Sequence, residues 1–447
     1  MNKYLIVGII LVVLVALLAT NKKLVETLKN IYKIEELRKR ILFTLGLLLI
    51  YRLGSFVTLP GVNHAALEAF TSSFENDNSL LGLLNVFSGG AFSQASIFAL
   101  GVMPYITASI IIQLLGIMVP YFRKMQREGE SGRRKMNQWT RFLTIGVLLL
   151  QAPAYLKTQV IPTGAVTQES MFIVTSTIIL IAGTMFIMWL GEKITDKGIG
   201  NGISLIIMIG IVARLPMAFL QEVTLKLGGA GSIIMLIVEL VFLALVFMFS
   251  IAIVQAVRKV PVQYAKRIVG NKQYGGVRQY IPLKLNAANV MPIIFAQALM
   301  FIPGLIWGGQ WLDIQGFWYN FTLAVLVIAF TYFYTAIIVN PQMMADDMKR
   351  NGGFIPGVKP GKSTVTYIDN IMTRITLPGS IFLAIITVLP AIAMTLGVNS
   401  SFAYFYGGTS LLIMVGVVLD TLKQIESHLL MRHYDGLMKT GRIQGRY

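Results

Sequence analysis

The sequence predicts an all-α integral membrane protein, and two properties of the chain support this fold class. Of its 447 residues, 55% are hydrophobic and only 13% are charged. Soluble domains carry about 25% charged residues, so a soluble fold of this composition would expose large apolar patches. The second property is that apolar runs long enough to cross about 30 Å of hydrocarbon recur along the whole chain. Soluble globular enzymes are therefore excluded as a class.

Ten apolar runs qualify as membrane spans. They lie at residues 41–57, 97–119, 139–156, 171–190, 199–219, 232–256, 288–306, 320–339, 371–393 and 404–422. Several contain proline, at Pro104, Pro153, Pro292 and Pro378. Such breaks persist in membrane helices where neighbouring helices or a watery cavity satisfy the freed backbone groups. The 41 glycines are typical of helices that pack closely.

An eleventh apolar run, from Tyr4 to Thr20, precedes these spans. Its 17 residues place it at the lower limit for a span. Only Lys3 lies ahead of it as a basic residue, and no clear small-x-small cleavage site follows, which disfavours a cleaved signal peptide. We favour an extra membrane helix here; an uncleaved signal-like anchor and a mis-assigned start codon are the alternatives.

The distribution of basic residues sets the predicted orientation. The chain has 38 Lys and Arg against 20 Asp and Glu, for a net charge of +18. Thirty-three of the 38 lie in one set of alternate connections, which includes both ends of the ten-span core. The opposite set holds Arg52, Lys157, Arg214 and Lys226. Because positive residues favour the cytoplasmic side, both ends of the core are predicted to be cytoplasmic.

Two long connections on the predicted cytoplasmic side differ from what membrane orientation alone requires, in basic residues or in length. Residues 258–286 hold seven basic residues and no acidic one, and are rich in Tyr and Gln. The second connection is 340–370. Orientation needs roughly two or three Lys beside a helix. Anionic partners such as ribosomal RNA, acidic protein or lipid headgroups suit these surfaces, so we predict that both loops dock a cytoplasmic partner. The alternative is that the basic residues only set the orientation of the chain in the membrane.

The spans lack most of the chemistry that transporters and enzymes use. Ionisable residues inside a membrane mark ion and proton paths, and Glu239 is the clear exception here. We favour a carboxylate near the outer interface or in an inter-helix hydrogen bond over a buried functional partner. There is no HExxH, GxSxG, intramembrane Asp pair or cysteine. We therefore expect no enzyme, metal or cofactor, and we read His64, His428 and His433 as solvated.

Residues 83–115 form an unusual segment. A short amphipathic piece containing Gly89 and Gly90 comes before a full span. This pattern predicts a short re-entrant helix on the outer side, followed by a transmembrane helix. Re-entrant backbone survives only where protein or water covers it. An interfacial helix lying flat on the membrane is the alternative.

From about Lys22 to the C-terminus, the chain resembles the SecY family, the central subunits of bacterial protein-conducting channels. The motifs that carry the resemblance are ELRKRILFTLGLLLIYRLGSF (36–56), FSGGAFSQASIFALGVMPYITASIIIQLL (87–115), EGESGRRKMNQWTR (128–141), MWLGEKITDKGIGNGISLII (188–207), YAKR (264–267), FIPGVKPG (354–361) and GGTSLLI (407–413). Long stretches in this order and spacing are very specific. Residues 1–21 fall outside the resemblance.

The resemblance implies a ten-helix SecY-type channel of two pseudo-symmetric five-helix halves, at residues 22–225 and 226–447. Such a channel passes unfolded secretory polypeptides across the membrane and releases hydrophobic segments sideways into the bilayer. A plug helix at about 84–96 would seal its outer funnel. The implied plug residues are Asn85, Phe87, Gly89 and Gly90.

The family's pore constriction is a ring of bulky aliphatic side chains. By motif, the ring falls on Val102, Ile106, Ile203, Ile207, Ile294 and Ile413. Val102 stands where the family usually has Ile, so we expect a slightly looser ring that still seals. Such a ring gates by dewetting and offers no fixed charge to an ion.

The resemblance also implies a lateral gate and a docking site. Gln113 and Gln297 lie on the second and seventh helices, where a polar seam would open toward lipid; inter-helix hydrogen bonding is the alternative. The resemblance implies that a motor and a ribosome dock on the two long loops. The implied docking residues are Lys266, Arg267 and Lys359. Lys359 replaces the family's usual Arg, which keeps the charge and loses the bidentate fork.

The implied partners are the SecE and SecG subunits, the SecA ATPase, the ribosome, SecDF, YidC, signal peptides, nascent polypeptides and anionic lipids. The implied location is the bacterial plasma (inner) membrane, with many passes. Because ATP or GTP hydrolysis occurs in the partners, the chain itself needs no catalytic residue. The alternative is a polytopic secondary transporter for a small solute, which needs polar groups at the midplane; these are missing apart from Glu239.

Overall fold

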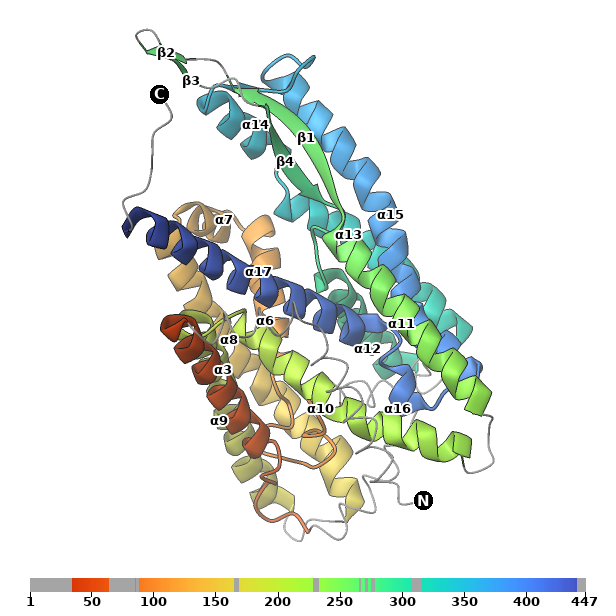
Figure 1. The fold of residues 1–447 in the computed structure, drawn as a ribbon. Coiled ribbons are helices and arrows are strands. Elements are labelled where there is room, and N and C mark those ends of the chain that lie inside the picture. The colour runs from red at the N-terminus through yellow and green to blue at the C-terminus, as the bar shows by residue number, and fades with distance from the viewer. Residues whose placement is uncertain are drawn as a thin grey trace. The chain divides into compact units, whose positions relative to one another are not determined.

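The computed structural model describes residues 34–63, 85, 88–164, 169–227, 233–264, 267–269, 272–274, 278–307 and 315–439. Most of these residues are helical (Figure 1). The helices are α3 (Glu35–Gly54), α6 (Met103–Met118), α7 (Pro120–Arg127), α8 (Glu130–Tyr155), α9 (Glu169–Lys197), α10 (Gly202–Leu225), α11 (Ile233–Gln255), α12 (Met291–Trp307), α13 (Phe317–Ile338), α14 (Pro341–Arg350), α15 (Lys362–Thr395), α16 (Ser400–Ala403) and α17 (Gly408–Lys439). The strands are β1 (Val257–Tyr264), β2 (Arg267–Val269), β3 (Lys272–Tyr274), β4 (Arg278–Lys284) and β5 (Gly353–Phe354).

A helix lies over each of the ten predicted spans. Among the described residues, α9, α10, α11, α13, α15 and α17 are long and apolar enough to cross a membrane. A seventh candidate consists of α6 and α7, which are bent by 101° at the break between them. The other three spans fall on α3 and α8, which begin with charged turns, and on α12, which has 17 residues. The helices agree with ten spans without establishing that number.

The prolines predicted to interrupt spans behave in two ways. Pro104 and Pro292 occupy the first turns of α6 and α12, where a missing N–H removes no helical hydrogen bond. Pro153 and Pro378 lie inside α8 and α15. Shortly after Pro153 the helix widens into the π-turn η1 (Leu156–Val160) and tightens into the 3-10 turn η2 (Ile161–Thr163). A proline removes one hydrogen bond of the helix, which favours such irregular turns nearby.

The described chain divides into two compact units. The first comprises the residues up to Leu236, with Asn399–Phe402 and the residues from Val417 onward. The second comprises Ile237–Val398 and Ala403–Gly416. In the first unit α8 packs on α6 and α9, and α9 packs on α3 and α10. In the second unit α13 packs on α12 and α15. The predicted boundary between two five-helix halves stays a prediction.

The predicted helix at residues 4–20 lies outside the described residues. Its placement in the membrane therefore stays a prediction, as does the location of the first residues of the chain.

Candidate functional site: an aliphatic ring, a turn segment and a docking sheet

Four of the six predicted ring residues lie in the first unit. Val102 is the N-cap residue of α6, and one turn later the Ile106 N–H donates to the Val102 carbonyl at 3.1 Å. Ile203 and Ile207 lie one turn apart near the start of α10. A spacing of four places the members of each pair on one helix face. Val102 is buried and the other three are half-buried, so α6 and α10 each present an aliphatic pair.

The other two ring residues lie in the second unit. Ile294 is half-buried near the start of α12, and Ile413 is buried near the start of α17. Each unit therefore supplies aliphatic side chains at the predicted positions. Closure of the six into one ring stays a prediction.

Residues 88–102, called the turn segment below, lead into α6. The structure corrects the prediction of one helix over 84–96: Asn85 is helical, but residues 88–95 form consecutive turns. Gly89 and Gly90 have φ angles of 65° and 95°. This left-handed conformation suits glycine and ends a helix, which accounts for the turns. Phe87 lies outside the described residues.

Asn85 organises the beginning of the turn segment. Its Oδ1 accepts a hydrogen bond from the Ser93 N–H at 3.1 Å. Its carbonyl accepts from the Gly90 N–H at 2.9 Å and from the Ser88 hydroxyl at 3.1 Å. Asn85 is 2% exposed, and buried polar groups are stable only when they are hydrogen-bonded. One asparagine thus closes the segment into a compact loop.

Two arginines from neighbouring helices donate hydrogen bonds to the turn segment. Nη1 of Arg52, in the last turn of α3, lies 2.8 Å from the Gly89 carbonyl. Nη2 of Arg214, in α10, lies 3.3 Å from the Ser93 hydroxyl. From the sequence, both arginines were counted only as rare basic residues of the predicted outer side, and these contacts were not predicted. A cation beside or within an apolar run needs a partner, and this property could have indicated them.

An apolar cluster surrounds the rest of the turn segment. The ring centroids of Phe92 and Tyr155 are 4.8 Å apart, and the Tyr155 hydroxyl donates to the Phe92 carbonyl at 2.6 Å. Thr58 forms an isolated antiparallel bridge with Ser96. The buried members of the cluster are Leu59, Phe92, Ala95, Ala99, Ala152, Tyr155, Leu156, Val160, Phe172 and Leu180. This packing covers a non-helical backbone, as a re-entrant segment requires.

One face of α10 carries both the ring residues and the seat of the turn segment. Ile203, Ile207, Gly210 and Arg214 follow one another at intervals of four, three and four, which keeps them on one face. A Cβ atom added to Gly89 would lie 2.9 Å from the Gly210 Cα. The turn segment therefore rests on α10 about one turn beyond Ile207.

The two predicted docking loops fold into one antiparallel sheet of the second unit. β1 pairs with β4 from Val257↔Lys284 to Gln263↔Arg278, so the described ends of residues 258–286 form an antiparallel strand pair. β5, from the second loop, pairs with the end of β1 at Gln263↔Phe354. The strand order is β4-β1-β5, and β2 and β3 form a separate pair. Both segments were predicted from the sequence as polar loops, and their strands were not predicted.

An apolar core joins this docking sheet to α14 and α15. Figure 1 shows β1, β4, α14 and the beginning of α15 side by side. The buried members of the core are Val260, Val262, Leu283, Met348, Ile355, Ile368 and Met372. Val260 and Val262 point to the same face of β1, as the two-residue period of a strand requires. The loops therefore form a packed platform.

The structure describes two of the three predicted docking residues. Lys359 is exposed in the turn after β5, and its carbonyl accepts from the Thr364 hydroxyl at 3.0 Å. Ile355, at 1% exposure, anchors this turn. Arg267 begins β2, and Lys266 lies outside the described residues. Lys359 is therefore accessible at the surface of its unit, and its docking role, shared with Lys266 and Arg267, stays a prediction.

Replacing Ile355 with alanine is expected to loosen the docking sheet. Truncating a buried isoleucine costs about 2–5 kcal/mol, because the transfer free energy is lost and a cavity remains. Limited proteolysis should cut residues 258–286 and 340–370 faster in Ile355→Ala. The adjacent Phe354→Ala is the matched control, since Phe354 is 38% exposed. Equal cleavage of the two variants would contradict the role given to this core.

The two predicted lateral-gate glutamines make different hydrogen bonds. Gln297, in α12, is buried, and its Oε1 accepts from the Thr409 hydroxyl of α17 at 3.5 Å. Gln113 donates to Ser109 of its own helix at 3.4 Å. The Gln297 contact is the inter-helix hydrogen bond kept as the alternative. A polar seam between the two glutamines stays a prediction.

Glu239, in α11, is 4% exposed, so its side chain is buried within the protein. Its expected place near the outer interface or in an inter-helix hydrogen bond stays a prediction. The Glu239 carbonyl accepts from the Tyr406 hydroxyl at 3.0 Å, and the rings of Phe242 and Tyr406 stack with centroids 6.0 Å apart. These contacts tie α11 to the segment before α17.

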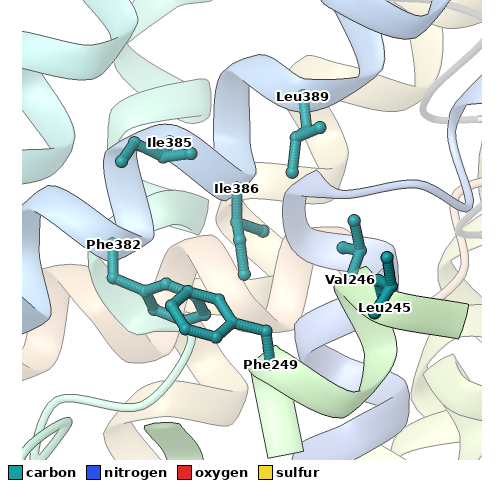
Figure 2. A pocket seen from close by; sticks show the side chains of 7 residues that line it. All are labelled: Leu245, Val246, Phe249, Phe382, Ile385, Ile386 and Leu389. Atoms are coloured by element: carbon teal, nitrogen blue, oxygen red, sulfur yellow. The ribbon is translucent and has the colours of Figure 1, made fainter. Parts of the chain in front are cut away.

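An apolar pocket of about 200 Å³ lies between α11 and α15 (Figure 2). Its lining residues are Leu245, Val246, Phe249, Phe382, Ile385, Ile386 and Leu389. The rings of Phe249 and Phe382 meet edge to face at 5.3 Å. A solute site combines an apolar lining with a few placed polar groups, and this lining is aliphatic and aromatic throughout. The pocket therefore offers no site for a polar solute.

Comparison with known proteins identifies the family. The family model described as SecY matches residues 96–422. A protein translocase subunit SecY from Streptomyces scabiei is 41% identical over 440 residues, covering 91% of this chain and 98% of the relative. That from Halalkalibacterium halodurans is 43% identical over 439 residues, covering 93% and 100%. That from Chlamydia trachomatis is 40% identical over 457 residues, covering 94% and 99%.

Solved structures confirm the fold. A structure described as a protein conducting channel matches with a TM-score of 0.58 at 17% identity, covering 87% of this chain and 91% of that chain. Sec61 in a canine ribosome–channel complex from the endoplasmic reticulum matches with a TM-score of 0.57 at 16% identity and the same coverage. The predicted fold class, a helical membrane channel of the SecY type, is thus confirmed, and the protein passes the membrane several times. The chain therefore belongs to the SecY family, together with the protein translocase subunits whose sequences it matches over more than nine-tenths of its length.

Proposed function

We propose that this chain is the channel subunit of a protein translocase. It passes unfolded secretory polypeptides across the membrane and releases hydrophobic segments sideways into the bilayer. The observation that carries the proposal is the face of α10, where Ile203 and Ile207 are followed directly by the seat of the turn segment at Gly210. An aliphatic constriction with a covering segment beside it is what a sealed polypeptide channel needs.

The proposed seal works through water exclusion. Six aliphatic side chains hold few waters and offer no charge, so an ion meets a desolvation barrier at the ring. A polypeptide in transit fills the ring and replaces the lost apolar contacts. The turn segment acts as the plug that covers the ring when no polypeptide is present.

Docking of energy-supplying partners is proposed for the sheet β4-β1-β5 and the turn that carries Lys359. The partners are the SecA ATPase and the ribosome. SecE and SecG complete the channel complex, SecDF and YidC act with it, and anionic lipids contact its basic side. Signal peptides and nascent polypeptides enter between Gln113 and Gln297. The location is the bacterial plasma membrane, with both ends of the ten-helix core cytoplasmic.

The alternative of a small-solute transporter is not supported. The relatives are protein translocase subunits, and the matching structures include a SecY protein and Sec61. SecY-family proteins are channels and not enzymes, and the hydrolysis that drives transport belongs to the partners.

Reconstitution tests the proposed function. The purified chain is placed in proteoliposomes with SecE and SecG, and SecA, ATP and a precursor with a signal sequence are added. We expect the precursor to become protected from added protease only when ATP and the signal sequence are both present. The same vesicles without ATP are the control. Absence of protection in complete vesicles whose chain is correctly inserted would overturn the proposal.

Gly89→Ala is expected to displace the turn segment. Its φ of 65° is left-handed, which costs an ordinary residue about 1–2 kcal/mol, and the new Cβ would lie 2.9 Å from the Gly210 backbone. Export of cargo with a defective signal should rise about tenfold, because 1.4 kcal/mol is a factor of ten. Gly46→Ala in α3 is the control, since nothing lies within 4 Å of its added Cβ. Equal export by both variants would contradict the seat on α10.

A further inference from the structure

We propose that Arg52 and Arg214 form a latch that holds the turn segment in its closed position. This inference rests on the proposed function of the turn segment as a plug. The two arginines come from different helices, α3 and α10, and donate to two different points of the segment, the Gly89 carbonyl and the Ser93 hydroxyl. They are positioning residues, because the groups to which they donate belong to the turn segment.

The side chain of Arg52 is fixed by contacts on its own helix end. Its Nη1 lies 2.8 Å from the Gly89 carbonyl and 3.4 Å from the Ser55 hydroxyl. Its guanidinium carbon lies 4.6 Å from the centre of the Phe56 ring, a cation–π distance. Ser55 in turn donates to the Arg52 carbonyl at 2.7 Å. These contacts orient the guanidinium before the plug arrives, so the bond to Gly89 costs little side-chain entropy.

Arg214 holds the segment through Ser93 and lies against Gly90. Its Nη2 donates to the Ser93 hydroxyl at 3.3 Å, and that hydroxyl donates to the Gly90 carbonyl at 3.1 Å. A Cβ atom added to Gly90 would lie 2.9 Å from Nη2. The guanidinium therefore occupies the space that a side chain at position 90 would take. The two neighbouring glycines thus allow two different close contacts. Gly89 lies against the backbone of α10, and Gly90 lies against the Arg214 side chain.

The latch is reversible for a physical reason. Hydrogen bonds from a charged donor strengthen where water is scarce, as in the closed, covered segment. When a polypeptide and water enter the outer funnel, the same guanidinium groups find water as an acceptor, and the net gain from the plug contacts falls. Removing one arginine should shift the equilibrium toward the open position by about tenfold, the size of a charge-assisted hydrogen bond.

Labelling of a single cysteine measures release of the plug directly. The sequence contains no cysteine, and Ala91 is 1% exposed, so Ala91→Cys provides a buried reporter within the turn segment. A membrane-impermeant maleimide is added from the outer side to resting cells that carry the complete translocase. We expect Arg52→Gln and Arg214→Gln each to raise the labelling rate about tenfold, and the double variant to raise it further. Lys157→Gln, which removes an exposed positive charge of the predicted outer side, is the matched control and should label at the parent rate.

A second variant separates contact from charge. Ser93→Ala removes the acceptor of Arg214 and the hydroxyl's own bond to the Gly90 carbonyl, and it leaves both arginines in place. It should raise the labelling rate at least as much as Arg214→Gln does. In the Ser93→Ala background Arg214→Gln should add little, because its interaction with Ser93 is already gone. A full further rise from Arg214→Gln in that background would overturn the contact. Parent-rate labelling of the Arg52→Gln, Arg214→Gln double variant would overturn the latch, as would an equal rise in Lys157→Gln.

Export assays keep this test distinct from the test of the proposed function. Precursors with a normal signal should be exported at the parent level by both arginine variants, which also shows that the variants fold. Precursors with a defective signal should be exported about tenfold more than by the parent. If the parent exported no precursor at all, the proposed function would fail, and the labelling rates would still decide the latch.

Discussion

Ile413→Asn is expected to raise export of cargo with a defective signal sequence by about tenfold or more. Ile413 is 6% exposed at a predicted ring position, and a buried amide there brings water into an aliphatic constriction. Loss of one buried apolar contact is worth about 1–3 kcal/mol, and each 1.4 kcal/mol of lost seal is a factor of ten. Phe87→Cys is expected to act in the same direction through the predicted plug. The measurement is the exported fraction of a precursor with a mutated signal.

The control for the ring is Ile413→Leu, which keeps apolar volume and should export at the parent level. If Ile413→Asn and Phe87→Cys both left export of the defective precursor unchanged, the assignment of the gate would be wrong. A general loss of export of normal precursors would indicate misfolding, so the normal precursor is assayed in parallel.

Reversing the charge at two predicted docking residues, Arg267 of β2 and Lys359 in the turn after β5, should have the second large effect. Replacing Arg267 and Lys359 with Glu puts two negative charges where an anionic partner is expected to bind, and charge reversal at close range costs several kcal/mol of affinity. Motor-dependent export should fall by at least about tenfold. Membrane insertion of the chain itself should remain intact, since both positions belong to connections that are predicted to be cytoplasmic and lie outside the predicted spans.

Lys197→Glu is the matched control for this reversal. Lys197 is exposed at the last residue of α9, in the first unit, and it lies outside the docking sheet. It should export at the parent level. Normal motor-dependent transport by the Arg267→Glu, Lys359→Glu variant would remove the support for the docking site.

The spans could be predicted from the sequence because hydropathy is a local property. Each predicted run lies on a helix, and the break between α6 and α7 falls before Pro120, where a proline opens the new helix. The pairing of β1 with β4 was missed for a local reason as well. Its apolar alternation in β1 is short, around Val260 and Val262, and Pro261 between them reads as a loop residue.

The surroundings of the turn segment could not be predicted, because they depend on distant contacts. Arg52 meets Gly89 across 37 positions, and Arg214 meets Ser93 across 121. The paired glycines indicated that the segment before α6 is unusual. Their positive φ angles, however, favour turns where a helix was expected. Resemblance supplied the ring positions, since an isolated valine or isoleucine in an apolar helix does not by itself indicate a pore.

Crosslinking from a polypeptide arrested in transit tests the central claim most directly. A photoreactive residue is placed in turn at positions 106, 203, 294 and 413, which belong to both units, and at the exposed Leu45 of α3 and Ile234 of α11 as controls. We predict crosslinks to the arrested polypeptide from all four ring positions and none from the two controls. Crosslinks confined to one unit, or absent from the ring and present at the controls, would contradict a single aliphatic constriction around the moving chain.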